Sequence, residues 1–227
     1  MRYLFVTGLP RSGTTVAARL LNHHPRCRLS IESHFPLDLL QAFRPSCGSD
    51  HCSQMDTVWH GDQVQKYPWQ LFRLNWTCSE QPPWKHLVRA AIAGIARDCL
   101  GEYEVFGDKS PAYVLMQSWR AVVDLFPDAR FIITERPLEE CVESLMRAEW
   151  WGQVGKTADD AREMLELHRS GMEEFKVSGH PWLGVPLSGL QQQPEQAIAD
   201  MLEFVGLDFD SYPMESAIAE MRGGPYN

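Results

Sequence analysis

The sequence predicts an α/β fold with a mostly parallel sheet flanked by helices. Short apolar segments alternate with amphipathic helical segments, a pattern typical of a parallel sheet covered on both faces. A turn bracketed by glycines follows the first apolar segment and precedes a helix. The clearest strand candidate, residues 129–135, is apolar and rich in β-branched side chains, as strands buried on both faces tend to be.

The first elements form a strand, a turn and a helix. Residues 2–7 are largely apolar and predict a strand, and residues 14–22 have the apolar spacing of a helix. A short strand over residues 28–31 follows after about six residues, a connection length typical of α/β proteins. Helix signals return over residues 36–43.

The later elements continue the alternation. Strands are expected over residues 103–107 and 129–135. Pro137 occupies the first turn of a helix, where proline is favoured, and acidic residues follow it. Gly206 ends the last predicted helix. The expected helices cover residues 86–100, 112–126, 137–147, 158–176 and 195–205.

Residues 44–84 show little periodicity and are rich in tryptophan, proline and cysteine. A segment this long without regular elements is usually a lid or a binding region. We therefore expect a single domain over residues 1–227, with residues 44–84 as a lid or binding region. Six tryptophans line an apolar binding pocket or else belong to the core: Trp59, Trp69, Trp76, Trp84, Trp150 and Trp151.

Charge and composition exclude several classes. The 227 residues carry a net charge of −9, which does not favour a broad nucleic-acid surface. No apolar run approaches the roughly 20 residues that span a membrane, and no signal peptide is evident, so we expect a cytoplasmic protein. Cys47, His51 and Cys52 lie close together, but their spacing fits no common zinc site, so no metal is expected.

The turn after the first strand reads GLPRSGTT over residues 8–15, with two glycines bracketing four residues as in phosphate-binding loops. Backbone amides at such a turn and the helix dipole both favour an anion. ATP-dependent enzymes place a lysine directly after the second glycine. Here that residue is Thr14, and the cation of the loop is Arg11, which argues against an ATP-driven kinase. A plain strand–turn–helix connection can show the same glycine spacing.

The motif PRSGTT resembles the 5′-phosphosulfate loop of sulfotransferases that use 3′-phosphoadenylyl sulfate (PAPS). A second block, residues 126–147, is similar to the family's 3′-phosphate block, in which an arginine at a strand end precedes a serine by eight positions. Arg136 and Ser144 occupy those positions. The resemblance implies a P-loop NTPase-like sulfotransferase fold, PAPS as donor and PAP as product, without a metal. It also implies that the loop residues bind the donor: Pro10, Arg11, Ser12, Gly13, Thr14 and Thr15.

Two residues after the second strand are candidates for the general base. Glu32 resembles the acid of the tyrosylprotein and related small bacterial sulfotransferases, which also follows the loop closely. His34 resembles the histidine base of the cytosolic aryl and steroid enzymes, although only the local pattern agrees. Residues two apart on an extended stretch share a face, and we favour Glu32. Lys109 resembles the lysine that contacts the transferred sulfate, and Asp108 is expected to orient it.

The sequence departs from the family near its C-terminus. The Tyr-acid-acid-Leu element and the late Arg-Lys-Gly loop are missing, and Arg222 is the candidate substitute on the 3′-phosphate. The resemblance implies sulfuryl transfer to a hydroxyl or amine of a small-molecule, lipid or peptide acceptor. Residues 44–84 are then expected on the acceptor side, and the binding pocket lined by tryptophans would be the acceptor pocket. The alternatives are a P-loop kinase that uses ATP and a non-catalytic nucleotide-binding protein.

Overall fold

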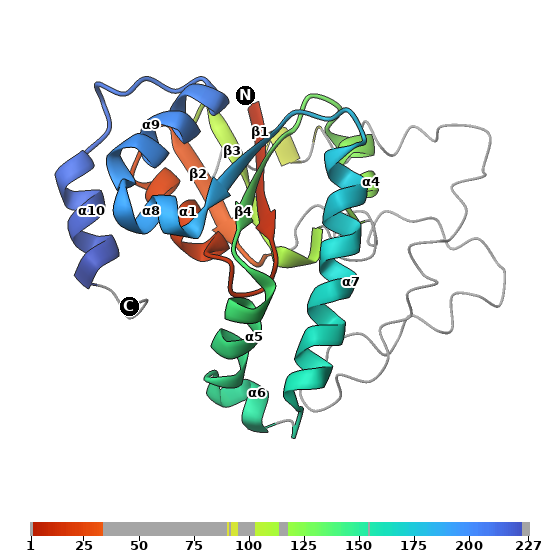
Figure 1. The fold of residues 1–227 in the computed structure, drawn as a ribbon. Coiled ribbons are helices and arrows are strands. Elements are labelled where there is room, and N and C mark those ends of the chain that lie inside the picture. The colour runs from red at the N-terminus through yellow and green to blue at the C-terminus, as the bar shows by residue number, and fades with distance from the viewer. Residues whose placement is uncertain are drawn as a thin grey trace, which may run out of the picture.

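The structure, a computed structural model, describes residues 2–33, 90, 92–94, 103–113, 118–153 and 155–223 (Figure 1). These residues contain a five-stranded sheet of order β2-β3-β1-β4-β5 in which every neighbouring pair is parallel. The α/β fold with a mostly parallel sheet is therefore confirmed. The strands are β1 (Arg2–Gly8), β2 (Cys27–Ile31), β3 (Val105–Lys109), β4 (Arg130–Glu135) and β5 (Trp182–Pro186).

Helices lie on both faces of this sheet (Figure 1). A 3₁₀ turn, η2 (Pro111–Tyr113), follows β3. The α-helices with bounds within the described residues are α1 (Thr14–Asn22), α4 (Ser118–Leu125), α5 (Leu138–Met146), α6 (Glu149–Gln153), α7 (Ala158–Lys176), α8 (Leu187–Gln192), α9 (Pro194–Val205) and α10 (Met214–Gly223). Residues 90 and 92–94 are also helical and lie within the helix predicted over residues 86–100. None of these described helices is long and apolar enough to cross a membrane.

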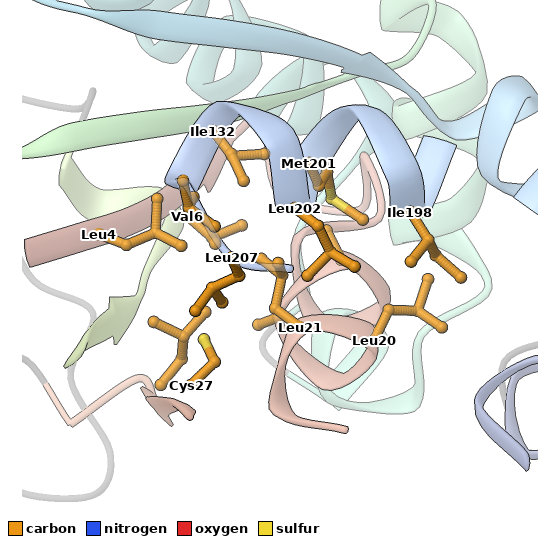
Figure 2. Packing of buried hydrophobic residues seen from close by; sticks show 14 of the residues in the cluster. Leu4, Val6, Leu20, Leu21, Cys27, Ile132, Ile198, Met201, Leu202 and Leu207 are labelled. Atoms are coloured by element: carbon orange, nitrogen blue, oxygen red, sulfur yellow. The ribbon is translucent and has the colours of Figure 1, made fainter. Parts of the chain in front are cut away.

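The two faces of β1 enter separate hydrophobic clusters, because successive strand side chains point in opposite directions. Leu4 and Val6 pack with residues of α1 and α9, as Figure 2 shows. Phe5 packs on the other face with residues of α4 and α7. The first strand is therefore buried on both sides at the centre of the sheet.

One glycine is required by the packing of the strands. A Cβ atom at Gly107 would lie 1.6 Å from the carbonyl oxygen of Leu4 on the neighbouring strand. The sequence predicts that the third strand ends at this glycine and covers residues 103–107. The strand instead runs through it to Lys109, so the predicted position was two residues too early.

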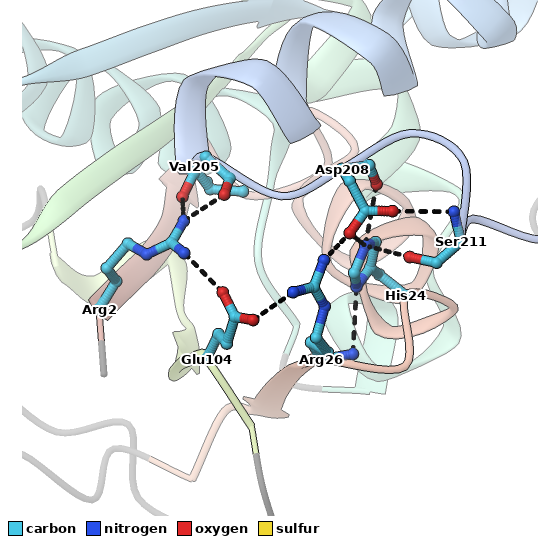
Figure 3. A network of polar contacts seen from close by, with 8 residues as sticks. Arg2, His24, Arg26, Glu104, Val205, Asp208 and Ser211 are labelled. Atoms are coloured by element: carbon cyan, nitrogen blue, oxygen red, sulfur yellow. Dashed lines mark hydrogen bonds and ion pairs between the residues drawn. The ribbon is translucent and has the colours of Figure 1, made fainter.

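A network of charged groups lies at the amino edge of the sheet (Figure 3). Arg2 bonds the carbonyl oxygens of Val205 and Gly206 at the end of α9, and its guanidinium also pairs with Glu104. Arg26 pairs with both Glu104 and Asp208. The network thereby fastens the first strand to the segment after α9.

Several other predictions can be compared with the structure. The helices over residues 14–22 and 158–176 are confirmed at both ends. The helix predicted over residues 112–126 is α-helical only over Ser118–Leu125 among its described residues. Four elements were not predicted: β5, α6, α8 and α10. The helix predicted over residues 36–43 and the segment 44–84 lie outside the described residues.

Candidate active site

The loop between β1 and α1 needs both of its glycines. Gly8 has a φ of 149° and Gly13 a φ of 98°. A Cβ at Gly8 would lie 2.5 Å from the carbonyl oxygen of Thr134, and one at Gly13 would lie 2.7 Å from Cδ1 of Leu187. The loop can therefore lie this close to β4 and α8 only because neither position carries a side chain.

Ser12 fixes the loop from within. Its buried hydroxyl lies 2.7 Å from the carbonyl oxygen of Leu9 and 2.6 Å from Oγ1 of Thr134. The backbone N–H of Ser12 also donates to Leu9, across 3.0 Å. Thus both the hydroxyl and the amide of Ser12 hold the loop together and against β4.

The start of α1 is arranged for an anion. Gly13 is its N-cap residue and supplies no side chain, so the N–H groups of the first turn are not capped by a side chain there. Thr14 is buried at this turn, and Thr15 is half-buried. Backbone amides and two hydroxyl groups are therefore available at the positive end of the helix dipole.

Arg11, Arg136 and Ser144 come together on the β4 side of the loop. Nε of Arg11 donates to Oγ of Ser144 across 3.1 Å. Nη1 of Arg136 donates to the carbonyl oxygen of Arg11, also across 3.1 Å, and its Nε pairs with Glu140. Arg11 has a φ of 71°, a conformation that non-glycine residues adopt rarely and that is concentrated at functional sites. Two guanidinium groups and the hydroxyl of an α5 residue thus gather beside the loop.

Lys109 and Glu32 form an ion pair on the opposite side of the loop. Lys109 ends β3 and is buried, whereas the carboxylate of Glu32 is half exposed. Glu32 directly follows β2 and has a φ of 54°, the second left-handed non-glycine residue of the described chain. A buried cation is therefore paired with an acid that solvent can reach.

A cavity of about 420 Å³ opens beside Arg136 at the carboxyl ends of β4 and β5. Its size is in the range of small-molecule sites. Its lining comes from the loop, from the β4–α5 and β5–α8 connections and from α7, and includes Leu9, Thr134, Glu135, Arg136, Pro137, Glu140, Met172, Pro186, Leu187, Ser188 and Gln191. Sequence reasoning missed this cavity because β5 and α8 were not predicted.

Two titratable groups near this cavity have shifted pKa values. Burial lowers the pKa of Lys176, but hydrogen bonding and charge interaction with Glu135 and Glu173 outweigh it, so the net shift is upward. Lys176 lies 2.8 Å from Glu135 and therefore stays a cation that offsets this cavity-lining carboxylate. Burial raises the pKa of Cys141 to about 11, so its thiol is neutral and packs as an apolar group.

Sequence reasoning also missed the partners of Asp108. Ser30, Ser33 and Tyr113 all hydrogen-bond its carboxylate. The sequence does show serines on either side of Glu32 and a tyrosine in DKSPAY. Their contact with Asp108 could not be predicted, because it depends on the pairing of β2 with β3.

The remaining candidates are placed differently. Arg222 is exposed near the end of α10, and α10 packs on α1 and α9. Its role in binding the 3′-phosphate stays a prediction. His34 lies outside the described residues, as do Cys47, His51 and Cys52. Trp151 is buried with α5 and α7 and belongs to the core rather than to an acceptor pocket. Within the described part of the chain, no three His, Cys, Asp or Glu side chains cluster as metal ligands.

Several solved structures of sulfotransferases have a similar fold. The sulfotransferase STF9 from Mycobacterium avium matches with a TM-score of 0.61 and 14% identity, covering 99% of this chain and 68% of that one. The sulfotransferase domain of the Synechococcus PCC 7002 olefin synthase has a TM-score of 0.60 and 19% identity, with 99% and 78% covered. The sulfotransferase domain from the curacin biosynthetic pathway has a TM-score of 0.63 and 17% identity, with 92% and 75% covered.

Identities this low speak for the fold alone, and the P-loop-like sulfotransferase fold is thereby confirmed. No curated protein matches the chain. A family profile described as the sulfotransferase family matches residues 4–211, which is nearly the whole chain.

Proposed function

Because the chain belongs to the sulfotransferase family, we propose that it transfers a sulfuryl group from PAPS to a hydroxyl or amine of an acceptor. The observation that carries the proposal is the order of groups along the carboxyl edge of the sheet. The cavity and the Arg136 cluster lie at β4 and β5, the loop follows the central β1, and the Lys109–Glu32 pair lies at β3 and β2. A donor laid across this edge meets a nucleoside site, a phosphate site and a transfer site in that order.

The donor is held mainly by the loop and by α5. The amides at the start of α1, with Thr14 and Thr15, hold the 5′-phosphosulfate. Arg136 and Ser144 hold the 3′-phosphate, a group that ATP does not have. The cavity beside Arg136 takes the nucleoside, and its apolar members Leu9, Pro137 and Leu187 suit a flat ring. Pro10, Ser12 and Gly13 shape the loop, and Arg222 is a further candidate for the 3′-phosphate.

Transfer proceeds in line at sulfur. The acceptor oxygen forms a bond to sulfur while the bond from sulfur to the 5′-phosphate oxygen breaks. Glu32 takes the proton from the acceptor, and Lys109 donates to the sulfuryl oxygens. Arg11 offsets the charge that develops on the departing phosphate, which leaves as part of PAP. These steps need no metal.

The pairing of Glu32 with Lys109 supports Glu32 as the base. A base must lie within hydrogen-bond reach of the acceptor, next to the group that is transferred. The ion pair places the carboxylate beside the cation proposed to hold the sulfuryl group, and it remains accessible to an incoming acceptor. His34 is the alternative base and lies outside the described residues.

The acceptor side of the proposal concerns the domain, residues 44–84 and the place of the reaction. We propose one domain over residues 1–227, with residues 44–84 covering an acceptor that carries a hydroxyl group on a small molecule, a lipid or a peptide. We place the reaction in the cytoplasm, without a nucleic-acid partner. A P-loop kinase is disfavoured because Thr14 stands where such an enzyme needs lysine.

Calorimetry with three nucleotides tests the proposal. We expect 3′,5′-ADP, the desulfated product PAP, to bind at least about tenfold more tightly than 5′-ADP or ATP with magnesium, since charged hydrogen bonds to the extra phosphate contribute about 1.5–3 kcal/mol. Arg136→Ala should remove this preference, whereas Arg169→Ala, an exposed position on α7, should keep it. Preference for ATP with magnesium would reject the proposal in favour of a kinase. Binding of 3′,5′-ADP without any turnover of PAPS would indicate a non-catalytic protein.

A further inference from the structure

Asp108 is a fully buried carboxylate in the strand that ends with Lys109. It is paired in the sheet with Ser30 of β2 and with Phe5 of β1. A buried carboxylate is costly unless hydrogen bonds compensate for the lost water. The hydrogen-bond donors around Asp108 therefore indicate which part of the structure this carboxylate holds in place.

Two of these partners, Ser30 and Ser33, precede and follow Glu32 in the chain. Oδ1 of Asp108 accepts hydrogen bonds from the hydroxyl of Ser30 across 2.6 Å, from the backbone N–H of Ser33 across 3.2 Å and from the hydroxyl of Ser33 across 3.0 Å. Oδ2 accepts from the hydroxyl of Tyr113 across 2.6 Å. The ring of Tyr113 packs edge-on against Phe5 in the core. The hydrogen bond to Oδ2 of Asp108 therefore comes from a side chain that the core keeps in place.

Between the two serines the chain turns sharply. The N–H of Glu32 still donates to the carbonyl oxygen of Lys109 across 2.7 Å, but its φ of 54° is left-handed. If β2 continued as a regular strand, Glu32 would point to the same face as Ser30. The left-handed turn instead lets its carboxylate reach Lys109. The hydrogen bonds of Asp108 to Ser30 and Ser33 hold the backbone on both sides of that turn.

We propose that Asp108 is a positioning residue for sulfuryl transfer, which holds the turn over residues 30–33 so that Glu32 faces Lys109 and the acceptor. This inference rests on the proposed role of Glu32 as base. Asp108 and Lys109 are successive strand residues, whose side chains leave the sheet on opposite faces. Asp108 therefore acts on Glu32 through the backbone of the turn.

Three variants distinguish the effect of the hydrogen bonds of Asp108 on kcat from the effect of its negative charge. The readout is release of 3′,5′-ADP from PAPS, which reports transfer to any acceptor including water. Asp108→Ala should lower kcat by about 10- to 100-fold, as expected when a reacting group is misplaced by about 1 Å. Asp108→Asn keeps an acceptor for the serines and a donor for Tyr113, so it should recover most of this loss. Ser33→Ala, at an exposed position that does not threaten folding, should cause a smaller loss of kcat.

Affinity and coupling distinguish positioning from general damage. The Kd for 3′,5′-ADP should change less than about twofold in every variant, because the donor site is on the other side of the loop. In a Glu32→Gln background, Asp108→Ala and Ser33→Ala should cause no further loss, since both act through Glu32. Losses that multiply in this background would overturn the positioning role, as would an Asp108→Asn variant as poor as Asp108→Ala.

The proposed function can fail separately from this inference. A wild-type protein that does not bind 3′,5′-ADP rejects the donor and with it the reaction. A wild-type protein that binds it, with a Glu32→Gln variant as active as wild type, rejects Glu32 as base and the positioning role together. A strong effect of Glu32→Gln with independent effects of Asp108→Ala and Ser33→Ala rejects only the role of Asp108.

Discussion

Arg11 and Ser144 are joined by a hydrogen bond of 3.1 Å, although 133 positions separate them in the sequence. The bond connects the loop after β1 to the buried face of α5. Arg136 completes the connection by donating to the carbonyl oxygen of Arg11. The groups proposed to hold the two phosphates of the donor therefore contact one another directly.

Ser144 offers a specific test of this arrangement. Ser144→Ala removes a hydroxyl that holds Arg11 and is proposed to bind the 3′-phosphate, so it should weaken 3′,5′-ADP binding by about 1–2 kcal/mol. Binding of 5′-ADP should change little, because that ligand has no 3′-phosphate. Calorimetry with both nucleotides measures the difference, and Ser216→Ala on exposed α10 is the matched control. Equal weakening for both nucleotides would contradict the assignment.

Lys109 should affect turnover rather than donor affinity. Lys109→Met replaces the ammonium with an apolar group of similar length and should lower the rate of 3′,5′-ADP release from PAPS by about 100-fold or more, in the range seen when a transition-state donor is removed. Binding of 3′,5′-ADP, which has no sulfuryl group, should be retained. Lys156→Met serves as the control, since Lys156 lies over the ring of Trp151 and is not among the residues proposed to bind the donor. Loss of 3′,5′-ADP binding would show that Lys109 holds a phosphate instead.

The loop glycines should differ in their sensitivity to substitution. Gly8→Ala would press a Cβ against the backbone of Thr134, which cannot move away without disturbing β4, and should lower the free energy of unfolding by about 2–3 kcal/mol. Gly13→Ala meets only the end of the Leu187 side chain and should cost less. Gly189→Ala, in α8 with open space around it, should be neutral or stabilising. Urea denaturation of the three variants tests this order, and an equal cost at Gly8 and Gly189 would refute it.

His168 makes stability depend on pH. Burial lowers its pKa to about 4, below the ordinary value of 6.5, while its Nδ1–H donates to the carbonyl oxygen of Met164. The unfolded chain takes up a proton as the pH falls through about 6.5, but the folded protein does not until the pH approaches 4. The neutral ring thus contributes stability that is complete above 6.5 and is lost on acidification.

The size of the effect follows from the shift. Between about pH 7.5 and pH 5, the free energy of unfolding should fall by about 2 kcal/mol more for wild type than for His168→Gln. Denaturation curves at both pH values give this difference, in which other titrating groups cancel. Parallel loss of stability in the two proteins would mean that His168 is not the group responsible.

The sequence was informative where local signals agree. The helix predicted over residues 158–176 agrees with the structure at both ends, and the structure shows a local cause, a capping box of Thr157 and Asp160 at its start. The glycine loop was predicted because its turn and its helix start are local. Arg136 was placed beside the loop correctly, since the ends of parallel strands share one edge.

The sequence was uninformative where tertiary contacts decide. β5 is a five-residue edge strand that contains Gly184 and ends in Pro186, residues that usually indicate a loop. Without β5 and α8, the cavity beside Arg136 could not be foreseen. The left-handed turn at Glu32 was also out of reach, because the hydrogen bonds that hold it come from Asp108 on another strand.

The central place of β1 has a consequence for how the chain folds. Both sheet neighbours of β1, β3 and β4, come far later in the chain than β1 itself. The apolar residues of β1 therefore have no strand partners until β3 and β4 have been synthesised, and the contacts of Arg2 with Val205 and Gly206 form only after α9 is complete. Such high contact order predicts slow folding, with an early apolar segment that chaperones have to cover until its partners emerge.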